Sequence, residues 1–215
     1  MIMIDLQNDK EEIVINDEKL IVKWGKRNPR FEKKYEDSVM RVLSTYGQKA
    51  TEYTETKGKI LGPGYEPYIM AYFIGLYSNK RIPLSEDSED CKVLGQPLGK
   101  WGLGETRQAK NGRIDSSLYF RHTYPKLVSY IFISLVAKTD IDWIALDKGD
   151  IKVNSVVTTL INTMEEYANY GFSVMEDKLK SDPSYFFSNR SFLDIFLQLT
   201  DKQIIEEESD KPEDL

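Results

Sequence analysis

The sequence contains only one cysteine and one histidine in 215 residues, and each low count excludes a class of site. Cys91 has no second cysteine with which to form an internal disulfide, so we expect a protein of a reducing compartment, the cytoplasm. It lies in a polar stretch without a nearby histidine and is not expected to act as a nucleophile. A zinc site needs several His or Cys ligands, so we expect no metal and a structural role for His122.

Long apolar runs are also missing. The longest candidate, Leu127 to Ala137, is shorter than the ~20 residues that a membrane helix needs, and we expect a core helix there. The N-terminus becomes acidic at Asp5, which is not typical of a signal peptide. The sequence therefore predicts no membrane association.

The composition is that of a globular protein with an aromatic core. Apolar residues make up 40% and charged residues 30% of the chain, which includes 13 Tyr and 9 Phe. The net charge of −6 argues against a nucleic-acid binder that uses its whole surface, but it allows a local basic patch.

Helical periodicity dominates the chain and predicts a mainly α fold. Helices are expected over residues 33–46, 68–77, 127–137, 155–170, 172–179 and 191–199, with Gly171 as the break between the fourth and the fifth. The helix over 68–77 is apolar on every side, as a helix buried at the centre of a fold is, and Gly75 would let a neighbour approach closely.

The N-terminal residues alternate instead. Glu12–Ile15 and Leu20–Trp24 flank a polar turn, which predicts a β-hairpin within residues 1–30. A single helical domain is expected over residues 31–200. Residues 201–215 are acidic, and we expect a disordered tail there.

The centre of the chain, Leu84 to Gly112, reads as a long irregular Gly-rich loop. Connections of this length are usually functional or disordered. The glycines of residues 95–104 fit neither a Walker loop nor a dinucleotide-binding loop, so no nucleotide cofactor is expected. Trp101, which lies among these glycines, indicates that the loop packs down on the fold.

Basic residues gather after the glycines, between Lys100 and Lys126, with Tyr119, Phe120 and Tyr124 among them. One interpretation is ion pairing with the acidic stretch Glu86–Asp90 or with an acidic partner. The other is contact with nucleic acid, in which cations hold phosphates and aromatic rings stack on bases. The candidate binding residues for protein or nucleic acid are Lys80, Arg81, Lys100, Trp101, Arg107, Lys110, Arg113 and Arg121.

Acidic residues near position 150 raise a second chemical hypothesis. Asp150 and Lys152 have the spacing of a D-x-K element, and Asp140 or Asp142 precedes them. Carboxylates of this kind could hold Mg²⁺ in a nuclease. Such a site needs a sheet, which this part of the sequence does not predict, so a solvated turn around Gly149 is favoured.

One segment resembles a known family. Residues Pro67–Tyr77, followed by Asn79-Lys80-Arg81-Ile82-Pro83-Leu84, are similar to a pattern in small accessory proteins of bacterial DNA-phosphorothioation and related phage-defence islands. The order Gly171-Phe172, Tyr185-Phe186-Phe187 and Phe192-Leu193 is similar too, whereas the glycines of 95–104 are not part of the pattern. The resemblance covers part of the chain. It implies a non-catalytic component that works beside ATPases, nucleases or DNA-modifying enzymes, and it transfers no catalytic residue.

These observations favour a non-enzymatic interaction subunit of a bacterial multi-protein assembly, one that acts with DNA in phage defence. Its partners would be other protein subunits of a defence or DNA-processing complex. The hairpin edge, and the loop with Trp101 and Arg107, would provide the contacts. The alternatives are direct DNA or RNA binding through residues 100–126, and a metal-dependent nuclease centred on Asp142, Asp150 and Lys152.

Overall fold

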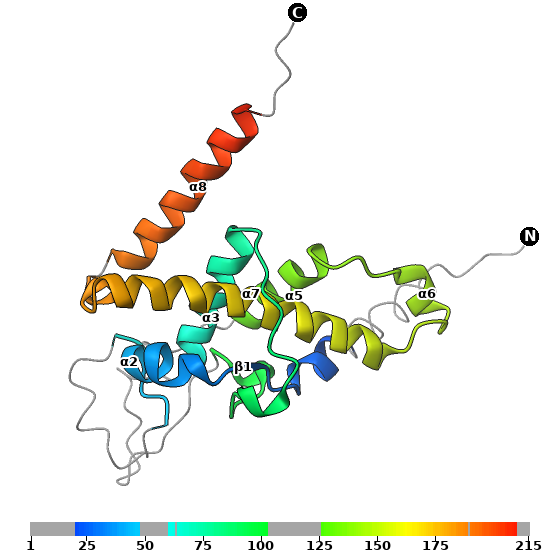
Figure 1. Cartoon of the computed structure of the whole chain (residues 1–215). Coiled ribbons are helices and arrows are strands. Elements are labelled where there is room, and N and C mark those ends of the chain that lie inside the picture. The colour runs from blue at the N-terminus through cyan, green and yellow to red at the C-terminus, as the bar shows by residue number, and fades with distance from the viewer. Residues whose placement is uncertain (1–19, 48–59, 63, 103–125, 189, 210–215) are drawn as a thin grey trace, which may run out of the picture. The chain divides into compact units, whose positions relative to one another are not determined.

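The structure is a computed structural model that describes residues 20–47, 60–62, 64–102, 126–188 and 190–209, the last nine by their backbone alone (Figure 1). The described residues are mainly helical, which confirms the mainly α class. The chain divides into two compact units, each assembled from separate segments. Unit 1 contains Met1–Pro29 and Leu94–Met164, and unit 2 contains Arg30–Val93 and Glu165–Leu215. The single helical domain expected over 31–200 stays a prediction.

The elements follow one another along the chain in a simple order. The α-helices are α2 (Arg41–Leu43), α3 (Tyr65–Tyr77), α5 (Leu127–Ala137), α6 (Trp143–Asp147), α7 (Val153–Ser181) and α8 (Ser191–Ser209). Short turns of other helix types are η1 (Glu36–Met40), η3 (Ser88–Asp90), η4 (Leu98–Lys100) and η5 (Tyr185–Phe187). Strands β1 (Arg30–Glu32) and β2 (Cys91–Val93) pair antiparallel, with Phe31 opposite Lys92.

The N-terminal prediction of a β-hairpin is wrong where it can be compared. Residues 20–25 are helical, whereas the first expected strand, Glu12–Ile15, lies outside the described residues. Leu20 and Trp24 are buried four positions apart, and Val22 between them is 49% exposed. That spacing places one face of a helical turn inward. The short apolar run Leu20–Trp24 is compatible with a strand as well as with a helical turn, so its pattern alone does not distinguish the two.

The core of unit 1 forms around two tryptophans. Trp24 packs edge-on against Phe132 of α5, with ring centroids 5.4 Å apart. Trp101 is fully buried, and its indole nitrogen donates a hydrogen bond to the carbonyl of Gln96 at 3.1 Å. The glycine-rich segment thus packs down as far as it is described, as the position of Trp101 predicted. Residues 103–112 of the expected loop lie outside the described part.

The core of unit 2 is a close crossing of α3 and α7. A Cβ added at Gly75 would lie 2.0 Å from the carbonyl oxygen of Tyr167, and one at Gly171 would lie 1.8 Å from that of Ala71. Gly75 therefore permits the close approach that its position predicted. Gly171 does not end a helix, as the sequence suggested, but lies inside α7, where α3 leaves no room for a side chain.

Aromatic rings fill the rest of unit 2. The ring of Phe172 stacks on Tyr35 at 5.3 Å between centroids and meets Tyr68 edge-on at 5.6 Å. Helix α8 joins this core through Phe196, whose ring lies 5.4 Å from that of Tyr77. Because α8 continues to Ser209, the first part of the segment expected to be a disordered tail is helical.

Candidate interaction surface

The chain leaves α3 through residues 78–85, which we call the strap. Asn79 takes the left-handed conformation (φ 48°), which reverses the chain at the helix end. The amide of Lys80 then donates to the carbonyl of Gly75 at 3.1 Å. The amide of Ile82 donates to the carbonyl of Glu166 in α7, also at 3.1 Å. Hydrogen bonds to α3 and α7 therefore hold the strap on either side of Arg81, at Lys80 and at Ile82.

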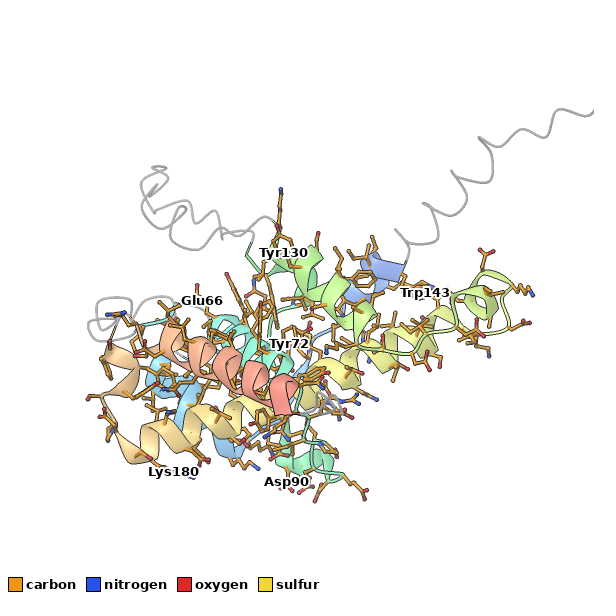
Figure 2. The ribbon with its side chains drawn as sticks, turned by 90° about the horizontal axis from the view of Figure 1, so that it is seen from above. Glu66, Tyr72, Asp90, Tyr130, Trp143 and Lys180 are labelled. Carbon is orange, nitrogen blue, oxygen red and sulfur yellow. The ribbon has the colours of Figure 1, made fainter. Side chains whose placement is uncertain are left out.

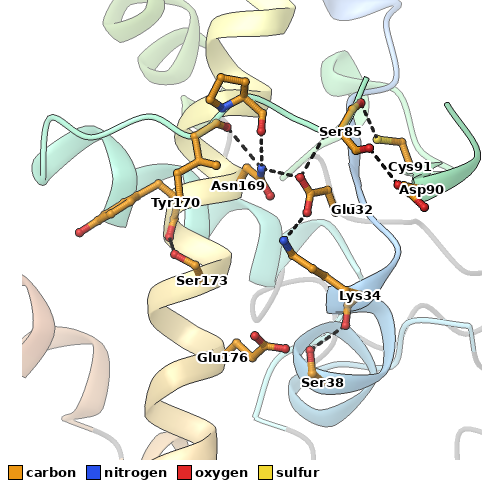
Figure 3. Close-up of polar contacts among 12 residues, drawn as sticks. Glu32, Lys34, Ser38, Ser85, Asp90, Cys91, Asn169, Tyr170, Ser173 and Glu176 are labelled. Carbon is orange, nitrogen blue, oxygen red and sulfur yellow. Dashed lines mark hydrogen bonds and ion pairs between the residues drawn. The ribbon is translucent and has the colours of Figure 1, made fainter. Parts of the chain in front are cut away.

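Buried polar groups hold the strap from beneath (Figure 3). The side-chain amide of Asn169 donates to the carbonyls of Ile82 at 3.3 Å and Pro83 at 3.0 Å, and to Glu32 Oε1 at 2.9 Å. Glu32 Oε1 also accepts from the amide of Ser85 at 3.2 Å. Asn169 is only 2% exposed, so water does not compete for these bonds. The path of the strap is fixed by this network.

The carboxylates beneath the strap and β1 are both paired. Burial tends to raise the pKa of Glu32, but hydrogen bonds from Lys34 and Asn169 outweigh it, and the pKa is lowered overall. Glu165 is 3% exposed and is held by Arg30, whose guanidinium donates to Oε2 at 2.9 Å and whose backbone amide donates to Oε1 at 2.8 Å. Charges buried in such pairs act as structural links between β1 and α7.

Two of the predicted binding residues, Lys80 and Arg81, lie side by side on the strap. The ammonium of Lys80 lies 5.9 Å from the ring centre of Tyr170, and the guanidinium carbon of Arg81 lies 5.7 Å from that of Tyr167. Both distances fall within the range of cation–π attraction. Arg81 also approaches a carboxylate oxygen of Glu166 at 3.6 Å, and its side chain remains 48% exposed.

The other predicted binding residues are placed differently. Lys100 is exposed at the end of η4 in unit 1. Trp101, next to it, belongs to the core of unit 1 and is not an exposed aromatic contact, which corrects the expectation that its loop would offer one. Arg107, Lys110, Arg113 and Arg121 lie outside the described residues, as does His122. Their pairing with nucleic acid or with Glu86–Asp90 stays a prediction.

The acidic stretch before β2 has local roles in the structure. Asp87 accepts from the amide of Glu89 at 2.8 Å and so caps η3, and Asp90 accepts from the hydroxyl of Ser85 at 2.9 Å. Cys91 is buried in β2, not placed in a polar loop as the sequence suggested. Burial raises the pKa of its thiol, which therefore stays protonated at neutral pH.

The residues proposed for a nuclease site lie at a helix start and a turn. Asp142 caps α6, where its carboxylate accepts from the amide of Ala145 at 2.9 Å. Asp150 and Lys152 are exposed in the turn that begins at Gly149 (φ 81°), which agrees with the solvated turn that the sequence favoured. Within the described ranges, no three His, Cys, Asp or Glu side chains are grouped as metal ligands would be.

An exposed apolar face on unit 1 was not predicted. Helix α5 contains no charged residue, and it buries Ile131 and Leu135. On its other side, Tyr130 (labelled in Figure 2) is 59% exposed and Ile133 is 62% exposed. We call these two residues the α5 face. No pattern in the sequence indicates this face, because an all-apolar helix is more often buried on every side.

Two further observations concern membrane-spanning helices and similarity to known proteins. None of the helices, as far as the chain is described, is long and apolar enough to cross a membrane. No protein-family model matches the sequence, and no similar curated protein or solved structure was found.

Proposed function

We propose that the protein is a non-catalytic interaction subunit of a bacterial multi-protein assembly, and that the α5 face docks on an apolar helix of another subunit. The observation that carries this proposal is the exposure of Tyr130 and Ile133 on a helix without charges. Burying a side chain of this size contributes roughly 1.5–3 kcal/mol. Two such side chains can anchor an interface if their helix is held rigidly.

The inner side of α5 supplies that rigidity. Ile131 and Leu135 are fully buried, and Phe132 packs on Trp24. With 11 residues, α5 is ~16 Å long and can accept about three turns of a partner helix. The chemistry that fits is an amphipathic helix with its apolar side toward α5, because α5 offers neither charges nor a strand edge.

The biological setting of the assembly rests on the resemblance of residues 67–84 to accessory proteins of phage-defence islands. On that basis the partners are subunits of a DNA-processing or defence complex. Direct DNA or RNA binding through residues 100–126 is the alternative, and the same experiment separates the two.

The test is affinity purification from the native host with wild type and Ile133→Glu, followed by analysis of the captured protein and nucleic acid. A charge on the α5 face should remove the captured subunits, because it would be desolvated in the interface. Thr159→Glu, which adds the same charge at an exposed position of α7, is the matched control and should retain them. Equal capture by Ile133→Glu and wild type would contradict the proposal. Loss of all captured protein after nuclease treatment would favour the nucleic-acid alternative.

A further inference from the structure

The backbone that carries the two cations of the strap is held in place by hydrogen bonds within the protein. Hydrogen bonds hold the backbone at Lys80 and at Ile82, and Asn169 holds the carbonyl that follows. The rings of Tyr170 and Tyr167 lie under the two charged groups. A site whose backbone is already ordered loses less conformational entropy when it binds a ligand.

The same cations are only partly neutralised. Among the residues that the structure describes, no carboxylate lies within 4 Å of the Lys80 ammonium. The 3.6 Å between Arg81 and Glu166 is longer than a hydrogen bond, so this contact leaves guanidinium donors open to another acceptor. A carboxylate can take a guanidinium and an ammonium together through charge-assisted hydrogen bonds.

Apolar surface adjoins the cations. Ile82, the next residue of the strap, is 38% exposed, and Tyr77 at the end of α3 is 52% exposed. A ligand that combines carboxylates with an apolar side chain would use both kinds of group. A peptide segment can have that combination in neighbouring side chains.

The negative charges that follow the strap also disfavour the binding of a nucleic acid. Glu86, Asp87, Glu89 and Asp90 are exposed directly after it, and the whole chain carries a net charge of −6. A polyanion that followed the chain from the two cations toward β2 would meet these carboxylates. A short acidic segment can contact the two cations without reaching these carboxylates.

We propose that Lys80 and Arg81, with Ile82 beside them, form a docking site for an acidic segment of a partner protein that also carries an apolar residue. The site deepens the function proposed above and rests on it, since it presumes that the chain is an interaction subunit. It belongs to unit 2 and is independent of the α5 face of unit 1.

The test measures the fluorescence anisotropy of a labelled peptide of alternating glutamate and leucine, titrated with the full chain at low salt. The peptide should bind wild type. The Lys80→Gln/Arg81→Gln variant should bind about tenfold more weakly, because two charge contacts are lost. Lys148→Gln/Lys152→Gln removes the same charge from exposed positions of unit 1 and should bind like wild type. Tyr170→Leu, which keeps both cations but removes a ring beneath them, should weaken binding by a smaller factor.

Several results would overturn the proposal. They are no binding of the glutamate–leucine peptide to wild type, equal binding by Lys80→Gln/Arg81→Gln, and tighter binding of a labelled single-stranded DNA that the same variant loses. The last result would assign the site to nucleic acid. None of these depends on Ile133, so failure here is distinguishable from failure of the α5 face, which the capture experiment tests.

Discussion

At two positions in unit 2, a single hydrogen atom is the largest side chain that fits. Gly75 and Gly171 each place their Cα against a backbone carbonyl of the facing helix. A Cβ added at either glycine would lie within 2.0 Å of that carbonyl oxygen. A carbonyl belongs to the backbone of a packed helix and cannot rotate aside as a side chain would. Any larger residue must therefore push α3 and α7 apart.

We expect Gly171→Ala to lower the free energy of unfolding by about 3 kcal/mol, at the upper end of the cost of overpacking a core. Urea denaturation followed by circular dichroism measures the change. Gly95→Ala is the matched control, because nothing lies within 4 Å of a Cβ added there, and its effect should stay within about 1 kcal/mol. Equal midpoints for Gly171→Ala and wild type would contradict the close crossing of α3 and α7.

The ion pairs of Glu36 with Lys92 and Arg41 should make the stability of the fold depend on pH. The hydrogen bond from Lys92, at 2.7 Å, lowers the pKa of Glu36 below its ordinary value of 4.5, and Arg41 adds to the effect. A carboxyl with a lowered folded pKa stabilises the fold above pH 4.5, and this stability is lost as the pH falls below that value.

Glu36→Gln should therefore reduce the loss of stability on acidification from pH ~5 to pH ~3, measured as urea midpoints across that range. Glu86→Gln, which removes an exposed carboxylate outside these ion pairs, should leave the slope close to that of wild type. If both variants kept the wild-type slope, Glu36 would not be among the groups that acid disrupts.

At the scale of elements, local signals in the sequence located helices well and long-range pairings poorly. Helix α5 has the predicted bounds, Leu127–Ala137, and α3 covers the predicted apolar helix. Strands β1 and β2 were not predicted, because each has three residues and its partner lies far along the chain. The role of Gly171 is not predictable from local sequence for the same reason, because it depends on Ala71 of another helix.

The candidate site was predictable only in part. A dipeptide such as Lys80-Arg81 is brought together by the covalent chain, so the sequence could identify it. Trp101 indicated that its loop packs down, but a ring that is buried in the core of unit 1 cannot also serve as an exposed contact. The α5 face depends on which side of an all-apolar helix lacks a neighbour, and periodicity carries no information about that.

Helix α6 provides a test that separates a cap from a metal ligand. Asp142→Asn should keep the stability of wild type, because asparagine caps a helix as well as aspartate, whereas Asp142→Ala should lose about 1 kcal/mol. Thermal or urea unfolding of the two variants measures the difference. A metal-dependent nuclease centred on Asp142 and Asp150 would instead lose its activity in both variants, and such a result would contradict the structural role.

At the scale of the whole molecule, α7 belongs to both units: residues 153–164 lie in unit 1 and residues 165–181 in unit 2. All three tryptophans, Trp24, Trp101 and Trp143, lie in unit 1. Tryptophan fluorescence therefore reports the unfolding of unit 1 alone, while far-UV circular dichroism reports the helices of both units.

We expect unfolding to be cooperative through this helix. Phe172→Ala, which removes a fully buried ring of unit 2, should lower the free energy of unfolding by about 3–5 kcal/mol and should shift the fluorescence and dichroism transitions together. Urea titrations of wild type and variant, each followed by both signals, make the comparison. A fluorescence transition that stayed at the wild-type midpoint would show that the units unfold separately.

The crossing of α3 and α7 has a consequence for biosynthesis. Unit 2 begins at Arg30, yet its contacts join Gly75 to Tyr167, Ala71 to Gly171, and Ile82 to Glu166. Loops of such length close slowly, and the nascent chain emerges from its N-terminus. The apolar helix α3 is therefore synthesised long before its partner exists. Until residues 165–171 have been made, the contacts that cover this apolar helix in α7 do not yet exist, and exposed apolar surface of that kind favours aggregation and chaperone binding.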